Sequence, residues 1–257
     1  MAEIKEKAKP FFYPANPGSQ SLALLIHGFT GSIYDLREIG EYLAGQGIDA
    51  MGVRLAGHGS CPEDLAKTTS GDWWQSVDKE IQAVKDKYQK IFLVGYSFGA
   101  NLAIDFSVRY PDIIKSVILL GPSVYIRRDR FYRLMLPLKR IFFNYQTKKL
   151  GNKKELLEYE DRGGYTKVAI KNIKDFFDFT RNYTKKEASL VRVPTLIIQS
   201  TRDRVVHPKS ALYVYKQIRS AKKELMLLDD HEHNPFFCDQ KHEIFEKITG
   251  FLKDNGK

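Results

Sequence analysis

Cysteine is scarce in this sequence, and long apolar runs do not occur. The two cysteines, Cys61 and Cys238, lie far apart and match no metal-ligand spacing, so we expect reduced thiols rather than a disulfide-stabilised secreted fold. No uninterrupted apolar stretch reaches the roughly 18 residues that a membrane-spanning helix requires. The opening residues MAEIKEKAKPFFYP are charged and contain neither an apolar region nor a small-residue cleavage site, unlike a secretory signal. We therefore expect a cytoplasmic protein without a transmembrane segment.

Sequence signatures of cofactor and nucleic-acid binding are also missing. No cluster of His, Cys and carboxylate residues has metal-ligand spacing, and no phosphate-binding P-loop occurs. The sequence contains no helix-turn-helix, RNP-like or zinc-finger pattern. We therefore expect no metal, no cofactor and no nucleic-acid partner.

Positive charge is concentrated in one part of the chain, whose net charge is +10. Residues 124–190 carry 17 Lys and Arg against 8 Asp and Glu, so about a quarter of the chain holds +9 of this total. We interpret this segment as a solvated basic face, and attraction to anionic lipid or substrate is an additional hypothesis.

The hydrophobic residues, 43% of the 257, follow the pattern of an α/β protein. Apolar runs predict buried strands at 22–28, 49–55, 91–95, 116–121, 195–200 and 223–229. Amphipathic stretches between them predict helices at 34–47, 73–88, 99–109, 208–219 and 239–253. Strands without polar alternation, separated by helices, predict a parallel sheet covered on both faces.

A serine lies where strand 91–95 must give way to helix 99–109, in the motif VGYSFG. Gly95 and Gly99 have no Cβ and let the chain reverse tightly beside the sheet, while Ser97 is expected in a strained conformation at the apex. A strand, G-x-S-x-G and a helix in this order are typical of a nucleophile elbow. The alternative is a turn serine that caps the helix.

A serine nucleophile requires a histidine base and a carboxylate that orients this base. Such partners are expected at the carboxyl ends of later strands. Asp203 follows strand 195–200, and His231 and His233 follow strand 223–229. The order Ser, Asp, His agrees with enzymes that have a nucleophile elbow.

Four ordered segments resemble one known family. LLIHGFTGS, LAGHGSCPEDLAKTTSGDWWQSV, VGYSFGANLA and PTLIIQSTRDRVVHP are similar to segments of α/β-hydrolases, specifically bacterial carboxylesterases and monoacylglycerol lipases. The similarity covers nearly the whole chain apart from the middle of the basic segment. It implies Ser97 as nucleophile, Asp203 as acid and a histidine near 233 as base. It also implies an oxyanion hole formed by the backbone N–H groups of Phe29 and Phe98.

The histidine loop departs from the family pattern. Relatives often have Gly before the catalytic His, whereas Glu232 precedes His233 here and His231 lies close by. We favour His233 as the base and keep His231 as the alternative. Asp229 and Asp230 are alternative acids, but they lie so soon before the histidines in sequence that they are poorly placed to support either ring.

The other histidines and one aspartate are expected to be structural. We expect His27 to support the oxyanion loop and His58 to stabilise its own loop. His207 and His242 are expected at the surface. Asp105, in the helix after the nucleophile, is expected to be solvated or capped.

The resemblance implies an α/β-hydrolase core, a mostly parallel sheet with helices on both faces, that carries an inserted, mainly helical cap. We place the core at 1–122 and 191–257 and the cap, or lid, at 123–190. In the stretch 168–183, Ala169, Ile173, Phe176, Phe177 and Thr180 fall on one helical face, which fits a cap packed over the site mouth. The expected substrate-binding residues are Gly28, Phe142, Phe143, Phe176 and Phe177.

These features predict a serine carboxylic-ester hydrolase for short- to medium-chain acyl esters, with monoacylglycerols as candidate substrates and an acyl-enzyme intermediate. An aromatic cap would favour apolar acyl groups. Because the triad belongs to the sheet, we expect alanine in place of the cap aromatics to leave acetate esters comparatively unaffected. The alternatives are an amide or peptide hydrolase with the same triad, and a non-catalytic ligand-binding protein on the same fold.

Overall fold

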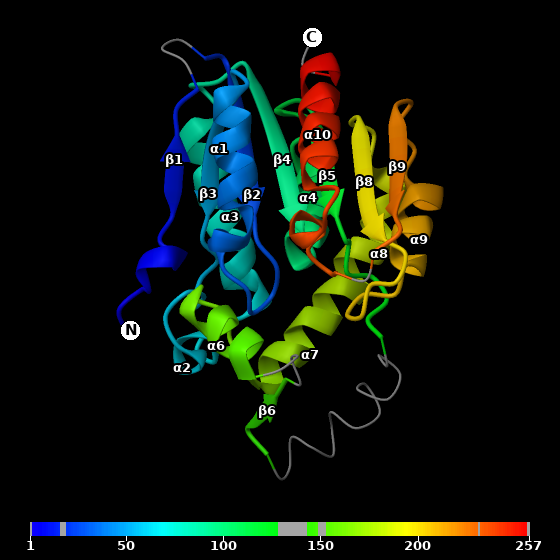
Figure 1. Ribbon diagram of the computed structural model, residues 1–257. Helices are drawn as coiled ribbons and strands as arrows, with labels where there is room; N and C mark the ends of the chain where they lie inside the picture. Colours follow the sequence, from blue (N-terminus) through cyan, green and yellow to red (C-terminus); the bar gives the residue numbers. More distant parts are fainter. Residues whose placement is uncertain (1, 16–18, 128–142, 149–152, 231, 256–257) are drawn as a thin grey trace.

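The computed structural model describes residues 2–15, 19–127, 143–148, 153–230 and 232–255 (Figure 1). Within these residues, seven strands form one sheet in the order β1-β3-β2-β4-β5-β8-β9. The strands are β1 Phe11–Tyr13, β2 Ser21–Ile26, β3 Asp49–Val53, β4 Lys90–Tyr96, β5 Ile114–Leu120, β8 Thr195–Ser200 and β9 Lys223–Leu228. β1 runs antiparallel to β3, and all the other neighbours are parallel. The predicted mostly parallel sheet is therefore confirmed.

The strands are apolar throughout because successive side chains enter two different cores. In β2, Leu22, Leu24 and Ile26 belong to one buried cluster, whereas Ala23 and Leu25 belong to the other. Side chains of a strand alternate between the faces of the sheet. Both faces are covered by helices, so neither favours polar residues, and the strand sequence becomes a continuous apolar run.

The helices of the sheet-bearing part lie on both faces of the sheet (Figure 1). They are α1 Arg37–Gly45, α3 Ser70–Val84, α4 Phe98–Arg109, α9 Lys209–Gln217 and α10 Lys241–Asn255. α1 and α10 pack into the cluster that contains Ala23, and α3, α4 and α9 into the one that contains Leu22. Among the described residues, no helix is both long and apolar enough to cross a membrane.

Some predicted bounds need correction. The helix predicted at 34–47 is divided into a 3-10 turn, η2 Ile33–Leu36, and α1. The helix predicted at 73–88 begins earlier, because Thr69 and Asp72 form a capping box before α3. β1 was not predicted, since three residues are too few to show a period. The remaining short elements outside the inserted segment are η1 Glu6–Ala8, α2 Pro62–Leu65 and η5 Pro235–Phe237.

We call residues 123–190 the cap segment. Its described elements are β6 Tyr145–Thr147, α6 Lys153–Asp161, β7 Lys167–Ala169, α7 Ile170–Phe179, the π-helical turn η3 Thr180–Thr184, α8 Lys185–Glu187 and η4 Ala188–Leu190. β6 and β7 form a separate antiparallel pair. In Figure 1, α6 and α7 lie beyond the carboxyl ends of the sheet strands. That this segment forms a domain of its own stays a prediction.

Candidate active site

The turn between β4 and α4 presents Ser97 in a backbone conformation that is rare for a residue with a side chain. Its φ is 55° and its ψ is −112°. A Cβ on Gly95 would lie 2.3 Å from the carbonyl oxygen of Gly99, and a Cβ on Gly99 would lie 2.0 Å from that of Ile26. The N–H of Ser97 donates to the carbonyl of Leu120 at 2.8 Å. Both glycines are thus required by close backbone approach, and this contact with the neighbouring strand holds the strained serine.

Three side chains from distant parts of the chain meet at this turn. The Nε2 atom of His233 lies 2.9 Å from the Ser97 Oγ, and its Nδ1 atom lies 2.7 Å from the Asp203 Oδ2. Asp203 is on the loop after β8, and His233 is on the loop after β9. The structure therefore brings together the serine, histidine and aspartate that the sequence analysis favoured. His231 lies outside the described residues.

The alternative acids point elsewhere. Asp229 is at the surface, where its Oδ1 lies 3.2 Å from the Nε of Arg202. Asp230 accepts a hydrogen bond from the N–H of Glu232 at 2.7 Å. The carboxylate that contacts the His233 ring is that of Asp203.

Asp203 is buried and still favours the ionised form. Burial alone would raise the pKa of its carboxyl, but the neighbouring His233 and the N–H groups of Val205 and Val206 outweigh burial and lower this pKa below its usual value. These N–H groups donate at 2.7 and 2.9 Å, and the Gln199 amide donates at 2.9 Å. A fixed carboxylate of this kind can orient the histidine ring and stabilise its protonated form.

The histidine ring lies against two further residues. The ring of Tyr96 is centred 5.1 Å from that of His233. Gly121 has a φ of +53°, and a Cβ there would approach the Cε1 of His233 to 3.2 Å. A side chain at this glycine would therefore be strained and would crowd the ring.

The loop after β2 passes directly over the serine. A Cβ on Gly28 would lie 3.0 Å from the Cβ of Ser97, so the close approach favours glycine. The rings of Phe29 and Phe98 are 6.4 Å apart. Within the described part of the chain, neither of their backbone N–H groups donates to a protein acceptor. Both are therefore free to donate to a negative oxygen, as an oxyanion hole requires.

Two buried histidines support this loop. His27 accepts a hydrogen bond from the N–H of Leu55 at 3.1 Å, and its other ring nitrogen lies 2.9 Å from the carbonyl of Gly28. Burial lowers the pKa of His27 to about 4, so it is neutral at physiological pH. His58 accepts from the N–H of Thr30 at 3.1 Å. Both contacts agree with the predicted structural roles.

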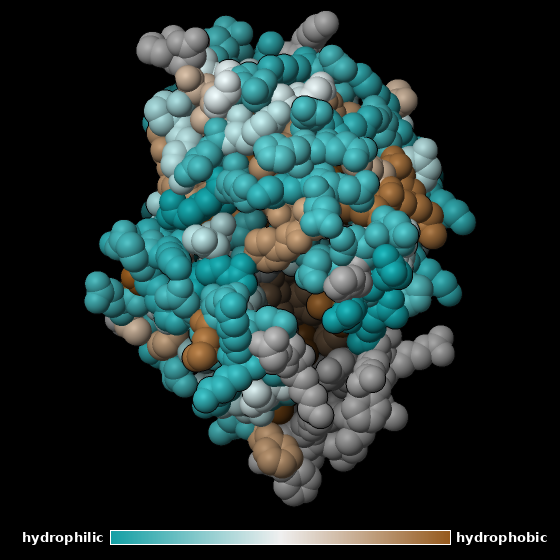
Figure 2. All heavy atoms as spheres, viewed as in Figure 1, coloured by the Kyte–Doolittle hydropathy of each residue, from teal (hydrophilic) through white to brown (hydrophobic). Residues whose placement is uncertain are grey.

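The aromatic residues predicted from the cap segment divide into three groups. Phe176 is buried, and its ring stacks on that of Phe29 at 5.4 Å and lies 5.5 Å from that of Phe98. Phe177 packs against Phe176 at 5.3 Å. Phe143 is 62% exposed and so is no part of this buried cluster, and Phe142 lies outside the described residues. Figure 2 shows a hollow with hydrophobic side chains in its wall between the sheet-bearing part and the cap segment.

The packing of Phe176 changes one expectation. Because its ring contacts both residues of the candidate oxyanion hole, removing it would disturb the site itself and not only an acyl pocket. We therefore expect alanine at this position to affect acetate esters as well as longer ones.

The prediction that Asp105 is solvated or capped is wrong. Its side chain is fully buried and accepts from the Trp74 indole at 2.6 Å and from the Arg109 Nε at 2.8 Å. The sequence pattern of a helix does not predict this burial, because α4 lies between the sheet and the cap segment and is buried on nearly all sides. His207 accepts from the N–H of Lys209 at the start of α9, and His242 is exposed, as expected.

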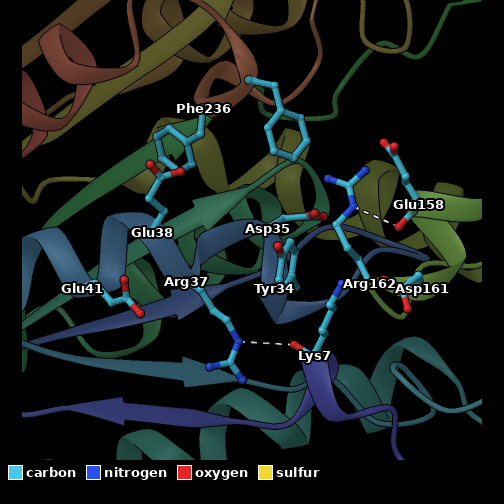
Figure 3. Close-up of a pocket in the computed structure, with 11 residues that line it drawn as sticks. Lys7, Tyr34, Asp35, Arg37, Glu38, Glu41, Glu158, Asp161, Arg162 and Phe236 are labelled. Atoms are coloured by element: carbon cyan, nitrogen blue, oxygen red, sulfur yellow. Dashed lines mark hydrogen bonds and ion pairs between the residues drawn. The ribbon is translucent and has the colours of Figure 1, made fainter. Parts of the chain in front are cut away.

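The described part of the chain also contains a polar cavity of about 540 Å³ (Figure 3). It is bounded by η2, α6 and η5, and its wall includes Asp35 and Arg162 but none of the three residues of the hydrogen-bonded triad. Burial raises the pKa of Asp35 to about 6, although the charges of Arg162, His233 and Lys148 oppose this rise. Because this wall contains no part of the triad, the candidate reaction site remains at Ser97. No motif in the sequence marks Asp35.

In the described ranges, no three His, Cys, Asp or Glu side chains lie close enough together to hold a metal ion.

Known proteins are similar to this chain along nearly its whole length. Residues 18–240 match the family described as serine aminopeptidase, S33. A carboxylesterase of Bacillus subtilis is 24% identical over 247 residues, which cover 95% of this chain and 96% of that protein. A thermostable monoacylglycerol lipase of a Bacillus species is 28% identical over 260 residues, which cover 95% and 96%.

Solved structures share the fold. A metagenome-derived lipolytic enzyme superposes with a TM-score of 0.86 at 24% identity and covers 98% of this chain and 100% of its own. The monoacylglycerol lipase of Paleococcus ferrophilus superposes with a TM-score of 0.79 at 19% identity, covering 96% and 98%. The predicted α/β-hydrolase fold and the resemblance to carboxylesterases and monoacylglycerol lipases are thus confirmed. With the family match covering most of the chain, the protein belongs to the serine aminopeptidase family of α/β-hydrolases and is a serine hydrolase similar to carboxylesterases and lipases.

Proposed function

We propose that this protein hydrolyses carboxylic esters through an acyl-enzyme, with Ser97 as nucleophile, His233 as base and Asp203 as the acid that orients it. The observation that carries the proposal is the continuous hydrogen-bonded chain from the Ser97 Oγ through the imidazole to the buried carboxylate, with distances of 2.9 and 2.7 Å. A serine hydroxyl is a weak nucleophile without such a base.

In the first half of the reaction, the Oγ of Ser97 attacks the ester carbonyl carbon while the Nε2 of His233 takes its proton. The carbonyl oxygen becomes an oxyanion and accepts hydrogen bonds from the N–H groups of Phe29 and Phe98. The histidine then returns the proton to the leaving alcohol as the C–O bond breaks. In the second half, water attacks the acyl-enzyme by the same route and releases the carboxylic acid.

For the substrate, we propose esters of short- to medium-chain acyl groups, monoacylglycerols among them. The buried ring of Phe176, the adjoining Phe177 and the approach of Gly28 to the serine support an apolar acyl site next to the oxyanion hole. The name of the similar Bacillus monoacylglycerol lipase supports this substrate class. Each methylene buried in such a site would add up to about 0.8 kcal/mol of binding.

Purified protein assayed with p-nitrophenyl esters of graded chain length tests this proposal. We expect turnover that rises from acetate to a medium-length chain and then falls. The matched control is Ser97→Ala, which retains the fold and loses the nucleophile. Equal turnover by both proteins, or no turnover by either, would reject the esterase.

A second candidate function is hydrolysis of amides or peptides with the same triad, because the matching family is described as serine aminopeptidase. The two reactions share every chemical group in the site and differ in the leaving group. p-Nitroanilides and amino-terminal peptides assayed beside the esters separate them. We expect esters to be the better substrates, and the reverse ratio would favour the peptidase. Binding of an ester without turnover would instead favour a non-catalytic ligand-binding protein.

We also propose that residues 123–190 act as a lid and that their positive charge attracts anionic lipid. The excess of 17 Lys and Arg over 8 Asp and Glu within residues 124–190 supports this attraction. Sedimentation with vesicles that contain anionic lipid should show binding at low ionic strength, which added salt screens. Binding that is absent, or that salt leaves unchanged, would leave the segment as a solvated face. The free thiols Cys61 and Cys238 support our proposal of a cytoplasmic location, which cell fractionation tests.

A further inference from the structure

Thr30, which follows Phe29 in the candidate oxyanion loop, has a backbone conformation that requires support. Its φ is 62°, and among the described residues with a side chain this positive φ is shared only with Ser97. Left-handed conformations are costly for a β-branched residue and persist when surrounding contacts hold them. The contacts that hold Thr30 therefore determine where this loop lies.

The backbone of Thr30 is held on both sides. Its carbonyl accepts from the hydroxyl of Tyr159 and from the N–H of Tyr165, each at 2.8 Å. Its N–H donates to the Nε2 of His58 at 3.1 Å. Its hydroxyl contacts the ammonium of Lys148. Three of these four partners, Tyr159, Tyr165 and Lys148, belong to the cap segment.

The stretch 159–165 is itself packed tightly onto the same loop. The hydroxyl of Ser32 donates to the carbonyl of Arg162. A Cβ on Gly163, whose φ is +88°, would lie 2.6 Å from the Cβ of Ala8 and 3.3 Å from that of Ser32. A Cβ on Gly164 would lie 2.5 Å from the ring of Tyr159. This packing limits where the ring can move and directs its hydroxyl at the Thr30 carbonyl.

Fixing Thr30 fixes the peptide that precedes it. The N–H of Thr30 and the carbonyl of Phe29 share one peptide plane, and the Phe29 N–H lies one residue earlier. An oxyanion hole accelerates acyl transfer because its donors are already oriented before the charge develops. A rotation of the backbone at Phe29 would turn the Phe29 N–H away from the oxyanion. Such a rotation would therefore weaken the hydrogen bond to the oxyanion more than the binding of the uncharged ester.

We propose that Tyr159 of the cap segment is a positioning residue for catalysis, whose hydroxyl holds the Thr30 carbonyl and thereby aligns the Phe29 N–H with the oxyanion. This inference rests on the proposed esterase function and adds a role for the cap segment beyond acyl binding. Lys148 assists from the other side of Thr30.

The test compares Tyr159→Phe with Tyr213→Phe. The first variant keeps the ring and loses only the hydroxyl. The second is a matched control, since the Tyr213 hydroxyl also donates to a backbone carbonyl of the cap segment, that of Lys185 at 3.2 Å. Steady-state kinetics on p-nitrophenyl acetate and butyrate give kcat and KM, and inhibition by an alkylboronic acid reports affinity for a tetrahedral adduct.

We expect Tyr159→Phe to lower kcat about tenfold for both esters, the effect of losing one well-placed hydrogen bond. KM should stay nearly unchanged, and boronic acid affinity should fall by a similar factor. Tyr213→Phe should leave kcat near that of the wild type. A merely structural hydroxyl would change the unfolding temperature without this split between kcat and KM.

If the kcat of Tyr159→Phe equals that of the control while the wild type is active, the positioning role is overturned and the esterase stands. A wild type that hydrolyses neither ester and does not bind the boronic acid would overturn the proposed function, and the positioning role with it. Should Tyr159→Phe fail to fold, Lys148→Met provides the second variant. It should lower kcat and boronic acid affinity together, and unchanged values would overturn the proposal that contacts of the cap segment on Thr30 align the Phe29 N–H.

Discussion

Two carboxyl groups lie together where α4 meets the cap segment, and their contact makes stability depend on pH. The Oδ2 of Asp105 accepts from Trp74 at 2.6 Å and from Arg109 at 2.8 Å. The buried Oδ1 of Asp105 and Oε2 of Glu187 have no hydrogen-bond donor among the described residues. Two such oxygens can bond to each other only when a proton lies between them. Burial, followed by the neighbouring charge of Asp105, accordingly raises the pKa of Glu187 to about 8.

We consider the substitution Glu187→Gln. The amide of the new side chain can donate a hydrogen bond to Asp105 and cannot ionise. The unfolded chain loses the Glu187 proton near its ordinary pKa of 4.5, whereas the folded chain keeps it up to about 8. Stability from this group is therefore greatest below pH 4.5 and falls as pH rises to 8. The whole shift would correspond to about 5 kcal/mol. Because Glu187 is partly exposed to solvent, screening reduces the effect, and we expect about 2 kcal/mol.

Urea unfolding followed by circular dichroism at pH 5, 7 and 9 measures this effect. The free energies of unfolding of the wild type and Glu187→Gln should be close at pH 5, and the variant should be about 2 kcal/mol more stable at pH 9. The exposed Glu246, replaced by Gln, is the matched control and should follow the wild type at every pH. Parallel curves for Glu187→Gln and the wild type would refute a shared proton at this contact.

Three further predictions concern the site and its frame. Ser97→Ala and His233→Ala should each lower p-nitrophenyl ester hydrolysis by several orders of magnitude with nearly unchanged circular dichroism, while His231→Ala should be milder; reversed severity of the two histidine variants would move the base to His231. Gly99→Ala should yield little folded protein, because its Cβ would lie 2.0 Å from a β2 carbonyl oxygen, and a wild-type unfolding temperature would contradict this. Phe176→Ala should cost about 3–5 kcal/mol of stability and lower kcat for acetate and longer esters alike; unchanged acetate turnover would show that its ring contacts do not position the oxyanion hole.

Local pattern was sufficient for the six parallel strands of the sheet and for the serine turn, but not for the three-residue antiparallel strand β1. Residues of a strand buried on both faces are apolar throughout, so the continuous apolar runs at β4 and β8 predict these strands directly. The glycines around Ser97 are required by close contacts with residues nearby in the chain and with the adjacent strand. The G-x-S-x-G motif therefore predicts this turn from the sequence alone. The ends of β8 and β9 likewise indicated where Asp203 and a histidine should lie, because parallel strands bring their carboxyl ends to one edge.

Contacts between distant segments were decided only by the tertiary structure. The 2.9 Å contact of His233 with Ser97 joins residues 136 positions apart, and no local pattern encodes which histidine of its loop reaches the serine. Asp105 lies in an ordinary helical sequence, yet the cap segment buries it beside a second acid. The hydrogen bond from the Tyr159 hydroxyl to the Thr30 carbonyl joins residues 129 positions apart. It depends on how the cap segment packs over the candidate oxyanion loop. Strands, helices and turns follow from the sequence through short-range periodicity and backbone sterics. The positions of the His233, Asp105 and Tyr159 side chains depend instead on packing between distant segments, which only the folded chain defines.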